Sequence, residues 1–451
     1  MPASSPAGRP IGFSTATAIV IGNMIGSGVF LLPAALSAYG GLSLVGWTLS
    51  AAGGVTLALV FARLARFSPR TGGPYVYTRR AFGDLPGFLV AWSYWISIWA
   101  ANSAIAVALV GYLDPFVPGL VRQPASAAML AIAAVWLLTL VNARGVRVAG
   151  RVQVVTTLLK ILPLVVVGLA GLVVLQPSHF AVPVEAAASP AASVMAVMTL
   201  TLWAFLGLES ATVPADEVRD PDRTIPRATV VGTVVAAAIY IMSTAGVMGV
   251  IEPEALGRSS APFAEAARAL FGGPAAALVA LGAAVSCFGA LNGWILLAGQ
   301  LPMGIARDGL FPSVFARMSS RGTPAAGMII GGILSSLLIA SNYARGLVDL
   351  FEFIIVLSTL GSLGPYAVCA LAGLLGRDGA PRSAARGAGV IVVAGLALLY
   401  SLFAIVGAGQ DALLRGVLAL VAGLPVFVWL RRGSRLTPNA PAAPPVDPAA
   451  P

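Results

Sequence analysis

The sequence predicts an all-α integral membrane protein of twelve transmembrane helices, built as two sets of five plus two, with the first and sixth helices broken. Three observations lead to this prediction. The composition is 58% hydrophobic and 10% charged, with a mean hydropathy of +0.92, which is typical of membrane proteins. Twelve apolar runs are long enough to cross about 30 Å of hydrocarbon. Glycines interrupt the first and sixth runs at matching places.

The apolar runs divide the chain into two repeats and an added pair of helices. The predicted spans lie near residues 12–36, 42–66, 84–112, 124–142, 152–175, 192–214, 227–251, 274–303, 325–342, 350–375, 387–407 and 411–431. We therefore expect an N-terminal tail at 1–11, five-helix repeats at 12–175 and 192–375, helices eleven and twelve at 387–431, and a tail at 432–451. The last segment is rich in proline and alanine, a composition that favours disorder.

The connections between spans differ strongly in arginine content. Most arginines lie after even-numbered spans or at the chain ends, and the opposite connections hold only Arg122, Arg258, Arg268, Arg345 and Arg415. The positive-inside rule then predicts a multi-pass protein of the cell membrane with both termini in the cytoplasm. The formal charge of +10 is confined to these connections and does not indicate nucleic-acid binding. One connection, residues 309–324, is expected to form a short amphipathic helix.

The first span is interrupted by three glycines and a serine within residues 22–30. Glycine is a poor helix former, and backbone groups freed in hydrocarbon have no water to bond. One interpretation is a broken helix whose amides, on Ser27 and Gly28, face a cavity and bind an anionic group such as a carboxylate. The alternative is a close helix-packing face made of small residues.

The sixth span carries a second interruption, with Gly207 and Glu209 deep in an apolar run. Interrupted segments at corresponding positions of two repeats are typical of a transporter substrate site, which favours the cavity. Glu209 is a candidate for a proton relay or a gate, because carboxylates within the membrane are costly and usually functional. The alternative is a carboxylate near a pore mouth that caps a helix.

Lys160 is the only lysine in the chain, and it lies about two turns inside the fifth span. An ammonium at this depth is costly unless it is paired or hydrated. We expect a fixed cation beside the first broken helix that bonds freed carbonyls. The alternative is a purely structural cross-link.

Polar and aromatic side chains share single faces of other spans. Helical spacing places Tyr94, Ser97, Ile98, Asn102 and Ile105 together on the third span, and Ser358, Ser362 and Tyr366 together on the tenth. Mixed polar and apolar groups suit a pocket for an amphipathic side chain. Trp203 and Trp294 could stack on a flat or cationic group, although either could equally be a packing residue.

The chain offers little for metal or enzyme chemistry. Cys287 and Cys369 lie in apolar runs and are interpreted as packing residues, and His179 is the only histidine. No cluster of acid, base or nucleophile lies at membrane depth, so we expect no enzyme, no metal and no cofactor. No ring of like charges indicates a channel.

These motifs resemble the amino acid–polyamine–organocation superfamily of transporters, and within it the basic amino acid/polyamine antiporters, in particular those that exchange arginine for agmatine. The resemblance covers nearly the whole chain and is carried by residues 22–33, 72–77, 202–210, 292–294 and 298–300. It implies a LeuT-type fold of five-plus-five inverted repeats that works by alternating access.

The resemblance also implies roles for individual residues. The substrate carboxylate would meet Ser27 and the Gly28 amide, the amino group would meet nearby carbonyls, and the side chain would end near Trp203. Implied substrate contacts are Asn23, Met24, Gly26, Ser27, Gly28, Ser97, Ile98, Asn102, Ile105, Trp203, Leu206, Trp294 and Ser358. Implied gating or proton-coupling residues are Tyr94, Lys160, Glu209 and Tyr366, and Trp294 also resembles a gate residue.

The chain departs from the arginine antiporter pattern at Ile98, Ile105 and Lys160. The isoleucines replace a thiol and a thioether, and the lysine resembles one whose ammonium stands in for a sodium ion in other carriers of the superfamily. Two functions follow. The first is an antiporter that exchanges a cationic, arginine-like amino acid for its decarboxylated, agmatine-like amine. The second is a proton-coupled symporter of broader or neutral specificity. The expected partners are amino acids, amines and the lipid bilayer, with protons and homodimer formation left open.

Overall fold

The computed structural model describes residues 10–342, 347–380 and 387–435. Within them the chain is helical, and the sole β-type pairing is an isolated bridge between Ile11 and Val218. Eight helices are long and apolar enough to cross a membrane, and four shorter apolar stretches lie at Phe13–Met24, Ala325–Ser341, Gly361–Leu374 and Gly416–Arg431. These twelve match the predicted spans in order, so the prediction of an all-α membrane fold is confirmed.

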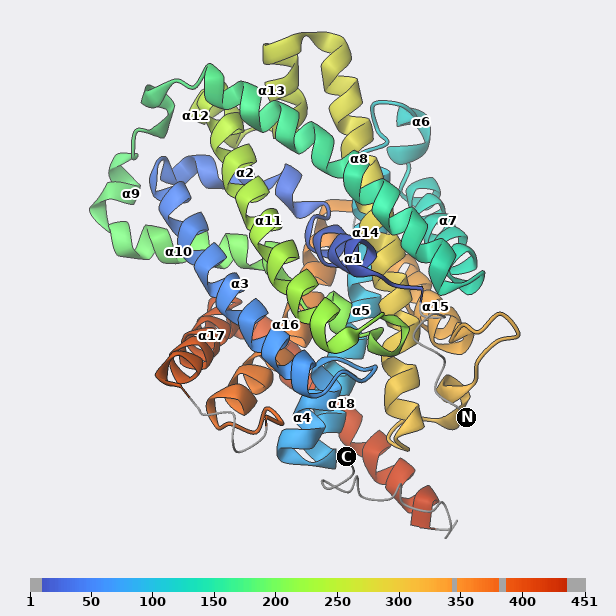
Figure 1. The fold of residues 1–451 in the computed structure, drawn as a ribbon. Coiled ribbons are helices and arrows are strands. Elements are labelled where there is room, and N and C mark those ends of the chain that lie inside the picture. Colours follow the sequence, from blue (N-terminus) through green and yellow to red (C-terminus); the bar gives the residue numbers. More distant parts are fainter. Residues whose placement is uncertain (1–9, 343–346, 381–386, 436–451) are drawn as a thin grey trace.

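The helices occur in the order of the predicted spans (Figure 1), and they are described in the expected grouping of two sets of five and a final pair, which stays a prediction. The first set comprises α1 (Phe13–Met24) with η2 (Gly28–Phe30) and α2 (Leu32–Leu36), then α3 (Leu42–Phe67), α5 (Asp84–Gly111), α7 (Pro124–Ala143) and α8 (Val146–Val173). The second comprises α10 (Pro190–Leu202) with η5 (Trp203–Phe205), η6 (Ser210–Thr212) and η7 (Ala215–Glu217), then α11 (Pro221–Val250), α14 (Gly273–Arg307), α15 (Ala325–Asn342) and α16 (Leu347–Leu374). The last pair is α17 (Ala388–Gly407) and α18 (Gln410–Arg435).

Short helices connect the spans. They are η3 (Ser37–Tyr39), α4 (Pro74–Phe82), α6 (Pro118–Val121), η4 (Pro177–Phe180), α9 (Val184–Ala188), α12 (Pro253–Gly257) and α13 (Pro262–Phe271). Most of them begin with proline, whose fixed φ suits the first helical position. The prediction of an amphipathic helix at 309–324 is wrong. Only η8 (Ser313–Ala316) forms there, between Gly309 and Gly322, which both have positive φ and end helical geometry.

Several helices extend beyond their apolar runs. α8 and α11 each begin six residues before the predicted spans at 152 and 227, and α18 continues to Arg435 although a disordered tail was expected from 432. The added turns carry arginines, which hydropathy excludes from a span but which are good helix formers. Residues 1–9 and 436–451 of the two expected tails lie outside the described residues.

α1 lies among α8, α11 and α14, so its interruption is enclosed by the bundle. α8 and α11 approach closely at glycines: a Cβ atom built on Gly246 would lie 2.3 Å from the Gly168 carbonyl oxygen. Small residues of this kind allow close helix packing in membranes. α8 has one buried face and one exposed apolar face: Lys160 is fully buried, whereas Leu158 is 67% exposed. We call the exposed apolar face the lipid-type face of α8.

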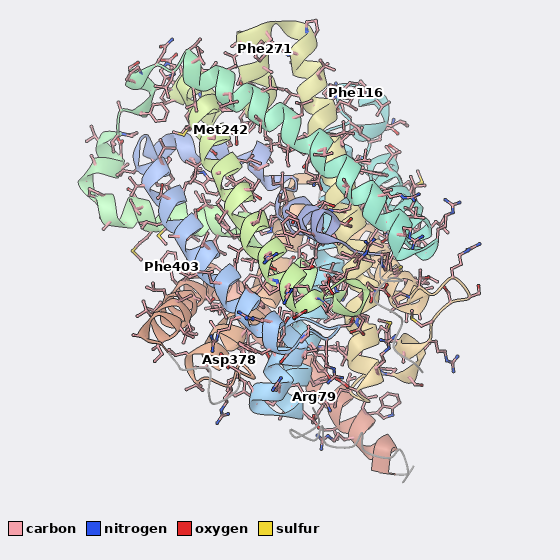
Figure 2. All side chains as sticks on the ribbon, in the orientation of Figure 1. Arg79, Phe116, Met242, Phe271, Asp378 and Phe403 are labelled. Atoms are coloured by element: carbon pink, nitrogen blue, oxygen red, sulfur yellow. The ribbon has the colours of Figure 1, made fainter. Side chains whose placement is uncertain are left out.

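Charged side chains gather at one end of the bundle, where α1 begins and α3, α14 and α18 end; we call it the arginine-rich end. Figure 2 shows Arg79 and Asp378 near this end and Phe116 and Phe271 toward the other. Ion pairs link its segments, including Arg79 with Asp84 at 2.8 Å and Arg307 with Asp216 at 3.2 Å.

Candidate substrate site

α1 is interrupted at the glycine-rich stretch. The helix ends at Met24, Ile25 is extended with ψ 91°, and the Gly26 amide turns back to donate to the Met24 carbonyl at 3.0 Å. The chain becomes helical again only at Gly28. The amides of Ser27 and Gly28 donate none of the backbone hydrogen bonds found among the described residues, and the buried Ser27 hydroxyl has no partner there. These are the donors that an anionic group would need.

The sixth span is interrupted after Leu202. One 3₁₀ turn (η5) follows, then Leu206 is extended with ψ 135°, and Gly207 has a φ of +98°. This backbone conformation favours glycine. Asn23 connects the two interruptions, because its Nδ2 atom donates to the Ser210 hydroxyl at 2.9 Å and its carbonyl accepts from the Trp294 indole at 3.3 Å.

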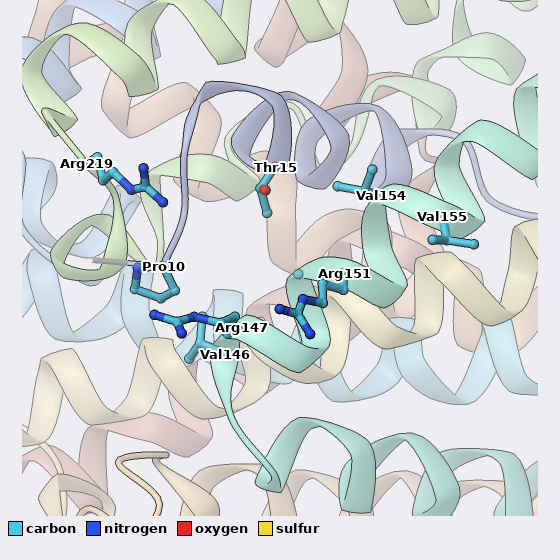
Figure 3. A pocket seen from close by; sticks show the side chains of 9 residues that line it. Pro10, Thr15, Val146, Arg147, Arg151, Val154, Val155 and Arg219 are labelled. Atoms are coloured by element: carbon cyan, nitrogen blue, oxygen red, sulfur yellow. The ribbon is translucent and has the colours of Figure 1, made fainter. Parts of the chain in front are cut away.

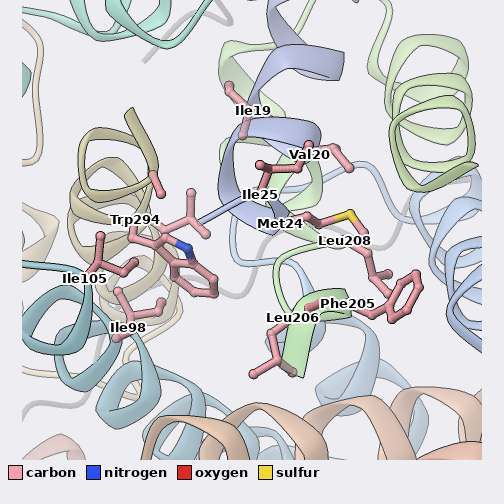
Figure 4. Close-up of a cluster of buried hydrophobic side chains, with 14 of the residues drawn as sticks. Ile19, Val20, Met24, Ile25, Ile98, Ile105, Phe205, Leu206, Leu208 and Trp294 are labelled. Atoms are coloured by element: carbon pink, nitrogen blue, oxygen red, sulfur yellow. The ribbon is translucent and has the colours of Figure 1, made fainter. Parts of the chain in front are cut away.

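A small cavity of about 30 Å³ lies where the two interruptions meet. Its lining comes from five elements and comprises Asn23, Met24, Gly26, Ala101, Ala104, Ile105, Trp203, Leu206, Trp294 and Ser358. Figure 4 shows Trp294 between Ile98 and Ile105 on one side and Met24 and Leu206 on the other. The volume is enough for only one or two waters, so an amino acid requires the lining to move apart.

Trp203 and Gly28 are in direct contact at one end of this cavity. A Cβ atom built on Gly28 would lie 1.9 Å from the Trp203 ring, whereas one built on Gly26 would meet only Ala290, at 3.9 Å. The indole therefore packs directly against Gly28, and only glycine at position 28 permits this approach. Gly26, by contrast, borders open space.

Lys160 is bonded to the end of α1. Its Nζ atom donates to the carbonyls of Gly22 at 2.8 Å and Ile25 at 2.7 Å, and the Ser286 hydroxyl adds 3.2 Å bonds to Ile25 and Gly26. No carboxylate of the described residues lies within 4.0 Å of the ammonium. The carbonyls at a helix C-terminus carry partial negative charge, which compensates the buried cation without an ion pair.

Glu209 lies within the second interruption, between η5 and η6, and two tyrosines hold its carboxylate. The hydroxyls of Tyr94 and Tyr366 donate to its two carboxylate oxygens, and the Gly207 amide donates to the Tyr366 hydroxyl at 3.0 Å. All three side chains are buried. The cluster joins α5, α16 and the interrupted sixth span, so any change in the charge of Glu209 would act on three elements.

The polar residues predicted on the third and tenth spans are only partly brought to the cavity. Ile105 and Ser358 line it, but Ser97 bonds the Ser362 hydroxyl at 3.0 Å and accepts from Ser358 through its carbonyl at 3.1 Å. Ile98 and Asn102 are not among the lining residues, and the Asn102 Oδ1 atom has no partner among the described residues.

Some lining and closing residues were not anticipated from the sequence. Ala101 and Ala104 line the cavity, and alanine carries no signal that distinguishes a pocket from ordinary packing. Spacing and composition also give no indication of the Asp308 cluster at the arginine-rich end. The Asp308 carboxylate pairs with Arg70 at 3.1 Å and Arg79 at 2.7 Å, and it accepts from the Tyr75 hydroxyl at 2.9 Å.

The site is closed toward both ends of the bundle. The Glu209 and Asp308 clusters lie on the arginine-rich side, where burial and the Asp308 charge raise the pKa of Tyr75 and keep its phenol a donor. On the opposite side the ring of Phe30 packs on Tyr112 and Phe263, with centroids 5.9 Å and 5.4 Å away. Side chains therefore pack across both ends of the bundle around the central cavity.

The comparisons with known proteins agree with this geometry. The model of the amino acid permease family matches residues 11–410. The putrescine transporter PotE of Haemophilus influenzae is 33% identical, over 92% of this chain and 96% of its own. The cadaverine/lysine antiporter of Escherichia coli strain K12 is 35% identical, over 79% of this chain and 82% of its own.

Among solved structures, MhsT in complex with L-phenylalanine matches with a TM-score of 0.67 at 14% identity, covering 88% of this chain and 98% of that one. This similarity confirms the LeuT-type fold. The chain is a membrane transporter and not an enzyme, and it belongs to the amino acid permease family of the amino acid–polyamine–organocation superfamily, among the basic amino acid and polyamine antiporters.

Proposed function

We propose that the protein exchanges a cationic amino acid for its decarboxylated amine, with arginine and agmatine as the first pair to test. The observation that carries this proposal is the meeting of two interrupted helices at one cavity lined by Trp203 and Trp294. The first interruption also carries unbonded donors on Ser27 and Gly28, directly after the lining residue Gly26. An amino acid and its amine share a cationic side chain, so one aromatic-lined site can accept both in turn.

The α-carboxylate would bind at the first interruption. The amides of Ser27 and Gly28 and the Ser27 hydroxyl are donors without partners among the described residues. Backbone amides freed at a broken helix are a recurrent way to bind substrate carboxylates in transporters. Trp203, which covers Gly28, would have to swing away as the carboxylate enters.

The cationic end would lie against Trp203 and Trp294. An indole face attracts a cation by about 0.5–2 kcal/mol, depending on desolvation. No carboxylate of the described residues lines the cavity, so the rings and Ser358 are the groups that would distinguish a cationic from a neutral side chain. The lining is more apolar than the arginine antiporter pattern because it contains Ile105, and Ile98 lies beside Ile105 (Figure 4). Lysine with cadaverine, the pair in the name of one relative, is therefore the second pair to test.

The two candidate functions differ in how proton movement is coupled to substrate transport. In the antiporter, Glu209 would take up and release a proton as the substrate charge changes, and Lys160 would remain a fixed cation. The specific observation that favours a proton-coupled symporter is the Lys160 ammonium on two carbonyls of the interruption. Loss of proton-driven uptake in Lys160→Ala, with exchange retained, would favour the symporter.

We also infer that the arginine-rich end faces the cytoplasm. Homodimer formation stays a prediction.

The test of the carboxylate site is Ser27→Lys, with Ser286→Ala as the matched control. Lysine at position 27 should fill the anion site and abolish arginine binding in a scintillation proximity assay with labelled arginine. The control removes a buried hydroxyl that bonds the same turn from outside the cavity, and it should bind arginine. Arginine binding by Ser27→Lys equal to that of the wild type would refute the carboxylate assignment.

A further inference from the structure

A second and much larger cavity, of about 600 Å³, lies at the arginine-rich end, outside the substrate site. It is bounded by the first turns of α8, by the beginning of α1 and by the segment that precedes α11. Figure 3 shows the guanidinium groups of Arg147, Arg151 and Arg219 around it, with Thr15 on the α1 side.

The charge of this cavity is strongly positive. Arg147 and Arg151 are four residues apart on α8, so they share one helical face, where like charges destabilise a helix. No ion pair of the described residues involves either of them. By contrast, Arg79 and Arg307 at the same end are each paired with a carboxylate, of Asp308 and Asp216 respectively. The α8 pair is therefore a concentration of positive charge without a counter-ion among the residues that the structure describes.

The third arginine is held in place by the backbone. The Arg219 amide donates to the Ile11 carbonyl at 2.9 Å, and the Ile11 amide donates to the Glu217 carbonyl at 3.0 Å. This pairing fixes the segment before α11 to the start of α1. Gly150 brings α8 close to the same place, since a Cβ atom there would lie 3.0 Å from Thr15. Two elements, α8 and the segment before α11, thus present three guanidinium groups to one space, and the start of α1 closes it with Thr15.

The cavity also reaches the lipid-type face of α8. Val155 lines it and is 55% exposed. Leu158 and Leu162, one and two turns further along the helix, are exposed apolar side chains of the same kind. An occupant can therefore place an anionic group among the arginines while its apolar part continues along α8. A small soluble anion would contact the arginines but would not use the apolar face of α8.

We propose that this cavity binds the headgroup of an anionic phospholipid from the leaflet at the arginine-rich end, with phosphate oxygens between Arg147, Arg151 and Arg219. Arginine binds phosphate through paired hydrogen bonds, and basic pockets between transmembrane helices suit anionic headgroups. The bound lipid would tie α8 to the segment that carries the start of α1, and α1 forms half of the substrate site. Anionic lipid is then expected to stabilise the whole transporter.

The experiment uses the full-length protein in phosphatidylcholine micelles, titrated separately with phosphatidylglycerol, more phosphatidylcholine, and inorganic phosphate. Native mass spectrometry counts bound lipid, and thermal unfolding reports stabilisation. The test variant is Arg147→Gln/Arg151→Gln, and the matched control is Arg317→Gln/Arg321→Gln. The control removes the same charge from exposed positions outside the cavity.

Wild type and control should retain one phosphatidylglycerol and melt at higher temperature with it, and the test variant should bind it about tenfold or more weakly. Arg219→Gln, which leaves α8 unchanged, should weaken binding in the same direction. Equal lipid retention by the test and control variants would overturn the proposal. Stabilisation by inorganic phosphate alone, equal to that by phosphatidylglycerol, would overturn the assignment to a lipid.

Discussion

Replacing Lys160 with methionine should destabilise the protein by loosening the interrupted end of α1. Methionine has similar length and no charge, so it removes both hydrogen bonds of the ammonium without opening a large cavity. The Gly22 carbonyl then loses its donor, because the Gly26 amide that would serve it in a continuous helix bonds Met24 instead. The Ile25 carbonyl keeps the weaker bond from Ser286.

The magnitude follows from these contacts. A hydrogen bond to a charged group contributes about 1.5–3 kcal/mol, and an orphaned buried acceptor costs about 1–3 kcal/mol. The variant also avoids the cost of burying an ammonium, which offsets part of the loss. We therefore expect a net destabilisation of about 2–4 kcal/mol, seen as a lower apparent melting temperature in micelles of fixed composition.

The matched control is Thr157→Val on the same two helices. The Thr157 hydroxyl donates one neutral bond, of 3.1 Å, to the Ala18 carbonyl about one turn away. Its loss should cost about 1 kcal/mol or less. If Lys160→Met melts no lower than Thr157→Val, the ammonium is not a cross-link of the first interruption, and the reasoning from its two bonds is wrong.

Four further substitutions test the site. Gly28→Ala should lower the melting temperature, because overpacking against Trp203 costs about 1–3 kcal/mol, whereas Gly26→Ala should weaken substrate binding at unchanged stability; equal effects of the two would contradict the geometry. Trp294→Leu should weaken binding of agmatine by more than that of alanine, as measured by competition, and equal weakening would indicate simple packing. Asp308→Asn, which removes the ion pairs at the arginine-rich end, should increase labelling of an introduced cavity cysteine from that side, and unchanged labelling would exclude a closing role for this cluster.

The fold and the two interruptions could be predicted because they depend on local chemistry. Span length follows from hydropathy. The glycines near 22–28 and at Gly207 favour a break in the helix, and a break within hydrocarbon indicates that the freed backbone faces a cavity. The contact of Lys160 with freed carbonyls was likewise predictable, because a sole lysine at that depth requires acceptors. Its role in coupling stays a prediction.

The remaining features depend on contacts between helices that are far apart in the chain. Local sequence patterns do not predict such contacts. Asp308 pairs with arginines more than 200 positions away, and the lining alanines are distinguished only by the cavity beside them. Ser97 illustrates the opposite case. It shares a helical face with Ile105, but its hydroxyl is engaged with Ser362 and does not reach the cavity. The helical starts at Val146 and Pro221 were missed because arginine-bearing turns fall outside an apolar window.

The measurement that tests the central claim most directly is uptake of radiolabelled arginine, and of lysine in a parallel series, into proteoliposomes. The lumen holds the corresponding decarboxylated amine, the same amino acid, or buffer alone. The proposed exchange predicts uptake against internal amine or amino acid and none against buffer. Uptake of neither amino acid, together with accumulation of a neutral amino acid into buffer-loaded vesicles under a proton gradient, would contradict it and establish the symporter.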